Sequence, residues 1–144
     1  MKKFLLSFTI ALCAIMSARA DDVAITPQQL PQEAQKFLKA NFAKSKIVMV
    51  TQDSGIFDKD YTVVLDNGTK VEFDSTGVWE SLKSRSGDIP ATLIPQPIID
   101  FVQQRYKGNK IIKIERGRNT YEVDLQGDIE LKFDKNFNCI DIDY

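Results

Sequence analysis

Carboxylates are the side chains in this sequence that could do chemistry, because the chain has no histidine and only two cysteines, Cys13 and Cys139. Without histidine, the chain cannot assemble a serine–histidine or cysteine–histidine nucleophile. Zinc sites built from histidine and cysteine are excluded as well. Cys139 lies in a strand pattern, and we interpret it as a small apolar residue rather than a reactive thiol.

A pair of carboxylates could hydrolyse a sugar or bind calcium. Asp134-x-Asn136-x-Asn138 begins like a calcium loop, but the glycine and the final glutamate of such a loop are missing. Most acids alternate with apolar residues or stand in turn sequences, which is typical of a solvated sheet face. We therefore expect no catalytic residue, no cofactor and no metal ligand. The acids considered are Asp58, Asp60, Asp66, Glu72, Asp74, Asp124, Asp128, Glu130, Asp134, Asp141 and Asp143.

The first twenty residues have the layout of a secretory signal peptide. Lys2 and Lys3 precede an apolar run over residues 4–16, and Ala18-Arg19-Ala20 offers small residues for cleavage before Asp21. The run is shorter than the ~20 apolar residues of a spanning helix, so an uncleaved anchor is the less favoured alternative. We expect a periplasmic or secreted protein with no membrane insertion after cleavage. The mixed charge, −1 in total, contains no basic stripe for nucleic acid.

The remaining chain repeats itself. Residues 31–50 align without a gap on residues 95–114, and residues 61–74 align on residues 121–134, so the first copy is longer between these blocks. Such self-similarity indicates two copies of one supersecondary unit. The identical pairs are Pro31/Pro95, Gln32/Gln96, Phe37/Phe101, Lys46/Lys110, Ile47/Ile111, Tyr61/Tyr121, Val63/Val123, Leu65/Leu125, Phe73/Phe133 and Asp74/Asp134.

Each copy predicts one helix followed by four antiparallel strands. Apolar residues at helical spacing, Phe37 and Phe101 among them, follow a proline at each helix start. Asn67-Gly68 and Gly127-Asp128 then separate alternating runs, which is a strong hairpin signal. We expect an α+β fold of two tandem repeats, residues 21–88 and 89–144, each with one helix packed on a four-stranded antiparallel sheet. A unit of this size buries only a marginal core alone, so the two copies should pack together or share a sheet. Phe37 and Phe101 should occupy equivalent buried positions.

The first copy also contains a set of short motifs: Leu30-Pro31, Phe37, Phe42, Lys46-Ile47, Tyr61-x-Val63-x-Leu65, Phe73-Asp74 and Gly77-x-Trp79. These motifs resemble the PepSY-like, beta-lactamase-inhibitor-like domain of exported bacterial proteins. The second copy departs from the pattern, with Phe137 and Cys139 in place of the glycine and the tryptophan. The resemblance implies a helix-on-sheet repeat with no established enzymatic activity, and it suggests that the open sheet contacts a partner protein.

The sheet face away from the helices is the expected interaction site. If Val48 and Val50 face the helix, alternation turns Met49, Val64 and Trp79 outward as an apolar cluster on a charged face. In the alternative interpretation, Trp79 covers a core edge or packs against the other copy. We expect a non-catalytic module that recognises an unknown protein or peptide. The competing class is a carboxylate-based calcium-binding or hydrolytic protein of the cell envelope.

Overall fold

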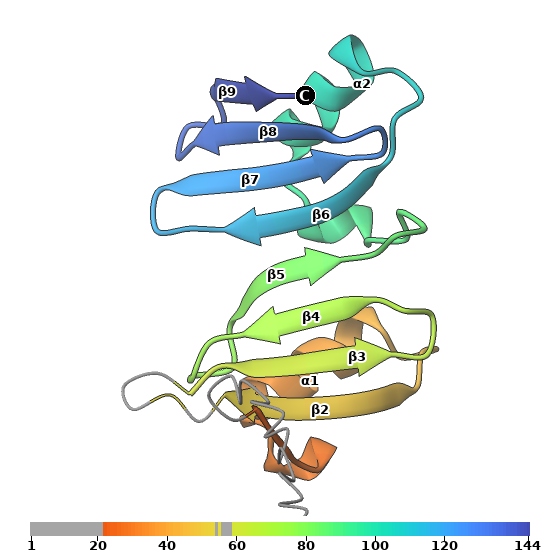
Figure 1. Ribbon diagram of the computed structural model, residues 1–144, viewed down its shortest axis with the longest axis vertical. Coiled ribbons are helices and arrows are strands. Elements are labelled where there is room, and N and C mark those ends of the chain that lie inside the picture. Colours follow the sequence, from red (N-terminus) through yellow and green to blue (C-terminus); the bar gives the residue numbers. More distant parts are fainter. Residues whose placement is uncertain (1–21, 54, 56–58) are drawn as a thin grey trace, which may run out of the picture.

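The structure, a computed structural model, describes residues 22–53, 55 and 59–144. The predicted signal peptide therefore lies outside the described residues. The described residues have an α+β fold, with two helices and one large sheet (Figure 1). The helices are α1 (Gln32–Asn41) and α2 (Gln96–Arg105), each preceded by a short 3-10 turn, Pro27–Gln29 and Ala91–Leu93. The strands are β1 (Asp22–Ala24), β2 (Ile47–Asp53), β3 (Tyr61–Leu65), β4 (Lys70–Phe73), β5 (Trp79–Lys83), β6 (Ile111–Arg116), β7 (Thr120–Leu125), β8 (Ile129–Asp134) and β9 (Cys139–Asp143).

All nine strands of the described chain join one antiparallel sheet in sequence order, β1 to β9. Four strands follow each helix along the chain, but they do not form two separate sheets. β5 pairs with β6 through Leu82 opposite Ile114, so the two predicted sheets are continuous. This pairing removes two strand edges that would otherwise leave their backbone groups open. β1 is an addition that the alternation pattern did not predict.

Both helices lie on the same side of the sheet, behind the strands in Figure 1. The sheet residues of that side form the core, with Phe73 and Phe133 fully buried. Phe37 and Phe101 occupy equivalent places, edge-on to these rings at 5.6 and 5.3 Å between centroids. Both phenylalanines are half-buried, whereas the sequence predicted buried positions. The innermost positions are taken by Ala34 and Leu38 on α1 and by Ile98 and Val102 on α2.

Backbone turns with positive φ connect the strands where the sequence indicated hairpins. Gly68, between β3 and β4, has φ +81°, and its N–H donates to Leu65 O. Gly127 and Asp128, between β7 and β8, both have positive φ, as a tight hairpin turn requires. Gly77 also has positive φ, and a Cβ there would stand 2.8 Å from Ala34 N. The Gly-x-Trp motif thus lets the β4–β5 turn pack closely against the start of α1.

Neither helix of the described chain is long and apolar enough to cross a membrane.

The open face of the sheet as a candidate interaction site

No element of the described chain covers the face of the sheet opposite the helices (Figure 1). An antiparallel sheet can leave one face in water when polar residues line it. Cross-strand pairing arranges the outward side chains of β2 to β9 in two parallel rows. The Met49 row contains Met49, Val64, Lys70, Lys83, Lys113, Asp124, Glu130 and Asp143, and the Thr51 row contains Thr51, Thr62, Glu72, Ser81, Glu115, Glu122, Lys132 and Asp141.

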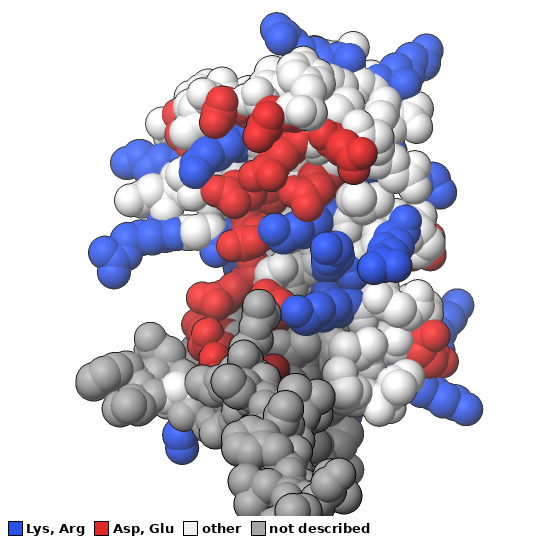
Figure 2. Space-filling view, viewed as in Figure 1, with Lys and Arg blue, Asp and Glu red and all other residues white. Residues whose placement is uncertain are grey.

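The Met49 row changes chemistry along its length. It is apolar on β2 and β3, basic on β4 to β6 and acidic on β7 to β9. Figure 2 shows the same face, with acidic side chains gathered above a band of basic ones. Like charges directly opposite each other on neighbouring strands are destabilising. Folding stability therefore does not explain why Lys83 stands between Lys70 and Lys113.

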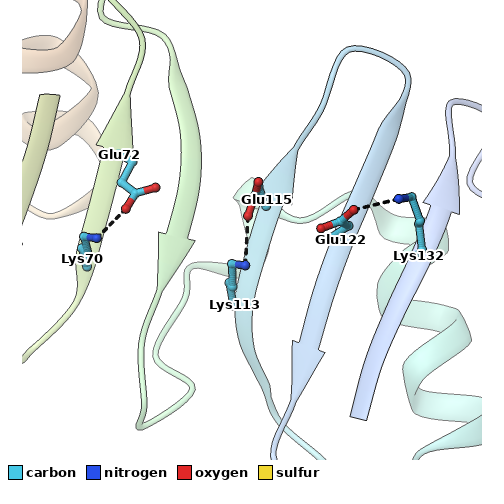
Figure 3. Close-up of polar contacts among 6 residues, drawn as sticks. All are labelled: Lys70, Glu72, Lys113, Glu115, Glu122 and Lys132. Carbon is cyan, nitrogen blue, oxygen red and sulfur yellow. Dashed lines mark ion pairs between the residues drawn. The ribbon is translucent and has the colours of Figure 1, made fainter. Parts of the chain in front are cut away.

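In the described chain, two ion pairs connect the two rows, and a third lies within the Thr51 row between β7 and β8 (Figure 3). Exposed pairs of this kind contribute about 0–1 kcal/mol, so they orient side chains more than they hold the fold. The pKa of Lys113 is raised by the hydrogen bond that its ammonium group donates to Glu115, although burial acts in the opposite direction. The pairs are Lys70 Nζ to Glu72 Oε1 at 2.5 Å, Lys113 Nζ to Glu115 Oε2 at 2.9 Å and Lys132 Nζ to Glu122 Oε1 at 2.9 Å.

The two charged parts of the Met49 row are not neutralised to the same extent. Within the described residues, Asp124, Glu130 and Asp143 of the acidic part form no ion pair, while in the basic part only Lys83 lacks one. Asp124 Oδ1 is also shielded from solvent without a hydrogen-bond partner there. A surface with this charge distribution can orient an approaching charged partner.

Two of the three residues predicted to bind a partner lie together on this face. Met49 is 49% exposed and stands directly opposite Val64, which is half-buried. Trp79 lies on the other face, opposite Phe73, and is only 8% exposed. The outward orientation predicted for Trp79 is therefore wrong. An extra residue, Glu80, stands between the paired positions of β5 and reverses the alternation at that point.

Val48 does not face the helix as expected, because β2 contains a second β-bulge. Ile47 pairs with Leu65 and Met49 pairs with Val64, which leaves Val48 as the extra residue. Val48 is 65% exposed instead of facing the helix. The sequence holds a signal for this bulge, because the four consecutive apolar residues 47–50 break the alternation of a half-buried strand.

Arg116 is a contact residue that sequence reasoning missed. Its guanidinium carbon lies 3.9 Å from the centroid of the Trp79 ring, and its Nε donates to Trp79 O at 3.1 Å. The Trp79 ring is also 6.2 Å from that of Phe37. Burial lowers the pKa of Arg116. This stack ties β5 to β6, so Trp79 stabilises the junction of the two halves.

The described carboxylates do not gather into a metal centre: no group of three or more histidine, cysteine, aspartate or glutamate side chains there could hold an ion. Asp134, the first residue of the calcium-like sequence, accepts hydrogen bonds from Asn136 N at 2.8 Å and Asn138 N at 2.9 Å. Asp74 accepts from Thr76 N at 2.9 Å in the corresponding turn. Both side chains thus act as turn acceptors.

These turn contacts make the folding stability depend on pH in the acidic range. Burial, the largest single influence, would raise the pKa of Asp74, but hydrogen bonds from Thr76 and the backbone lower it below 3.8. Hydrogen bonds from Asn138 lower the pKa of Asp134. The lowered folded-state pKa values contribute stability above pH 3.8 that is lost as pH falls through them.

We expect Asp134→Asn to flatten the loss of stability between about pH 4 and 2, because the variant has no carboxylate to protonate at this turn. Urea denaturation across this range measures the effect, with Asp128→Asn as the control, since Asp128 lies in a hairpin turn on the same half. A loss as steep in Asp134→Asn as in the unchanged protein would contradict the assignment.

Comparison with known proteins agrees with this architecture. A family described as "Putative beta-lactamase-inhibitor-like, PepSY-like" matches residues 16–63 and 59–141. A crystal structure described as a "putative periplasmic protein from DUF2874 family" of Bacteroides vulgatus is 41% identical, with 86% of this chain and 98% of that chain covered and a TM-score of 0.80. None of the curated proteins matches the chain.

Two further crystal structures are similar. One, from Bacteroides thetaiotaomicron, is described as a "putative calcium-regulated periplasmic protein"; it is 43% identical, with 86% and 98% of the two chains covered and a TM-score of 0.82. The other, a "putative periplasmic protein of unknown function" from Bacteroides vulgatus, is 29% identical over 86% and 100% of the chains, with a TM-score of 0.80. The predicted periplasmic localisation is confirmed, and the chain belongs to the PepSY-like, beta-lactamase-inhibitor-like family of periplasmic proteins.

Proposed function

We propose that the protein is a non-catalytic exported module that binds a protein or peptide partner through the open face of its sheet. The observation that carries the proposal is the order of side chains along the uncovered Met49 row, which runs from apolar to basic to acidic. Apolar side chains grouped on an otherwise charged surface are typical of interaction sites. The like-charge neighbours of the row cost stability, which supports a role for the row outside folding.

The apolar and charged parts of the row have different tasks in this proposal. Met49 and Val64 supply the contact that a partner desolvates, since buried apolar anchors dominate binding energy. The charged parts accelerate encounter and set the orientation of the partner. Trp79 does not touch the partner and holds the junction between the halves through Arg116.

The proposal includes the organisation of the chain. A signal peptide over residues 1–20 is removed on export, and residues 21–88 and 89–144 are two copies of one unit. The first copy provides the apolar part of the Met49 row, and the second provides its acidic part. Pairing of β5 with β6 makes these parts one surface.

Calcium binding is the alternative that the carboxylates raise, and the similar Bacteroides thetaiotaomicron protein is described as calcium-regulated. The described residues of this chain offer no cluster of metal-ligating side chains. We therefore assign calcium no part in partner binding. A calcium titration followed by thermal melting distinguishes the two, because a bound ion raises the melting temperature with concentration.

Replacing both Met49 and Val64 with lysine should leave the fold intact and weaken partner capture by more than about 2 kcal/mol. The reason is that both side chains point away from the core, and the variant removes the apolar anchor. The measurement is quantitative capture from the periplasm of the native host by immobilised protein, with circular dichroism to check folding.

Val48→Lys is the matched control, because this residue is exposed on the same strand but belongs to neither row. It should capture the partner as the unchanged protein does. Equal capture by the double variant and Val48→Lys, with both folded, would overturn the assignment of the apolar anchor.

A further inference from the structure

A cavity beside α1 is separate from the open face and has no part in the proposed partner contact. It lies between the 3-10 turn Pro27–Gln29, one side of α1 and the start of β2, and its volume is about 320 Å³. This falls at the lower end of the range for small-molecule sites. Its apolar wall includes Leu30, Leu38, Phe42, Ile47 and Leu65.

Gln35 lines this cavity. Its Nε2 donates to Leu30 O at 2.8 Å and to Gln28 O at 3.2 Å, so the side chain is tied to the wall. In the second half of the chain, the aligned residue is Ile99, which packs against the core. The first copy thus has an amide at a position where the second has a core side chain.

The polar residues lining the cavity include one cation. Lys39 is exposed and forms no ion pair within the described ranges, whereas Lys36 on the same helix pairs with Glu33 at 3.0 Å. None of the described residues that line the cavity is a carboxylate. The cavity therefore combines an aliphatic wall with a single unpaired positive charge.

The geometry points to a binding site for a free aliphatic carboxylate, with its chain against Leu38, Phe42 and Leu65 and its head at Lys39. The volume corresponds to roughly ten water-sized groups, which suits an alkyl chain of medium length. The charge complementarity selects a carboxylate over a neutral or cationic head. The site is confined to the first half of the chain, because Ile99 and Gln103 replace Gln35 and Lys39 in the second.

Isothermal titration of the full mature chain with decanoate, decanol and decyltrimethylammonium, all below their aggregation concentrations, tests the site. We expect saturable binding with one decanoate per chain, weaker binding of decanol and still weaker binding of the cation. Nitrogen–proton NMR should place the largest shifts in α1 and the start of β2. Absence of decanoate binding, or equal binding of the three probes, overturns the proposal.

Two variants test separately the contact with the carboxylate of the ligand and the contact with its alkyl chain. Lys39→Glu should weaken decanoate about five- to tenfold, while Lys36→Glu, the matched control, should leave it nearly unchanged. Gln35→Ile introduces the residue of the second copy and should reduce binding of decanoate and decanol alike. Because Gln35→Ile could disturb the Leu30 contact, Lys39→Glu carries the decision, and equal effects of the two glutamate variants would contradict the site.

Discussion

Replacing Phe73 or Phe133 with alanine should lower the free energy of unfolding by about 3–5 kcal/mol, the usual cost of deleting a fully buried aromatic side chain. Both residues are 0% exposed, and each receives the edge of a helical phenylalanine ring. The substitution removes this ring contact and leaves a cavity between helix and sheet. Urea denaturation followed by circular dichroism measures the change in each variant.

Phe37→Ala and Phe101→Ala are the matched comparisons, because these rings belong to the same two contacts but are only half-buried. They should cost less than the strand variants. A loss below about 1 kcal/mol in both strand variants would show that the helices do not pack on the sheet as described.

Lys83→Glu should instead stabilise the protein, by about 0.5–2 kcal/mol. Lys83 stands opposite Lys70 on β4 and Lys113 on β6, so the substitution turns two like-charge pairs into two opposite-charge pairs, each worth roughly 0.2–1 kcal/mol. The gain should shrink at high salt, because Lys83 is exposed and Lys70 and Lys113 are only half-buried. Urea denaturation at low and high salt measures both effects.

The same variant should capture the partner less well, because it interrupts the basic part of the Met49 row. A gain in stability together with a loss of binding is the signature of a site retained for function. Lys107→Glu is the control, since this exposed lysine lies after α2 and has no cross-strand neighbour. A destabilised Lys83→Glu variant would contradict the pairing of β5 with its neighbours.

Local signals in the sequence predicted the elements of each half well. Asn67-Gly68 and Gly127-Asp128 mark real hairpin turns, because few other residues adopt the positive φ that these turns need. The apolar spacing around Leu38 and Val102 correctly gave the buried side of each helix. The family motifs were also sufficient to identify the family.

What the sequence could not show depends on contacts between distant residues. The pairing of β5 with β6 joins Leu82 to Ile114, and no pattern within either strand specifies that edge. The bulge at Glu80 moved Trp79 from the open face into the core, because one extra residue reverses every facing beyond it. Strict alternation from Leu82 therefore gave the wrong side for Trp79.

The charge order of the Met49 row was hidden for the same reason. Each strand contributes only one residue to the row, so its basic and acidic parts emerge only when the register across β4 to β9 is known. The acids on the strands could be assigned to the open face from the alternation alone. Their separation from the lysines along the row could be recognised only once the continuous sheet was known.

Site-specific photo-crosslinking tests the central claim, that the open face is the partner-binding surface. A photoreactive residue would be placed at Val64 or Lys83 on the Met49 row, and at Lys36 or Gln104 on the exposed sides of the helices. Irradiation in the native periplasm should yield one protein crosslinked from the row positions, suppressed by excess unlabelled protein, and none from the helix positions. Crosslinks to that protein from the helices alone, or equally from all four positions, would contradict the claim.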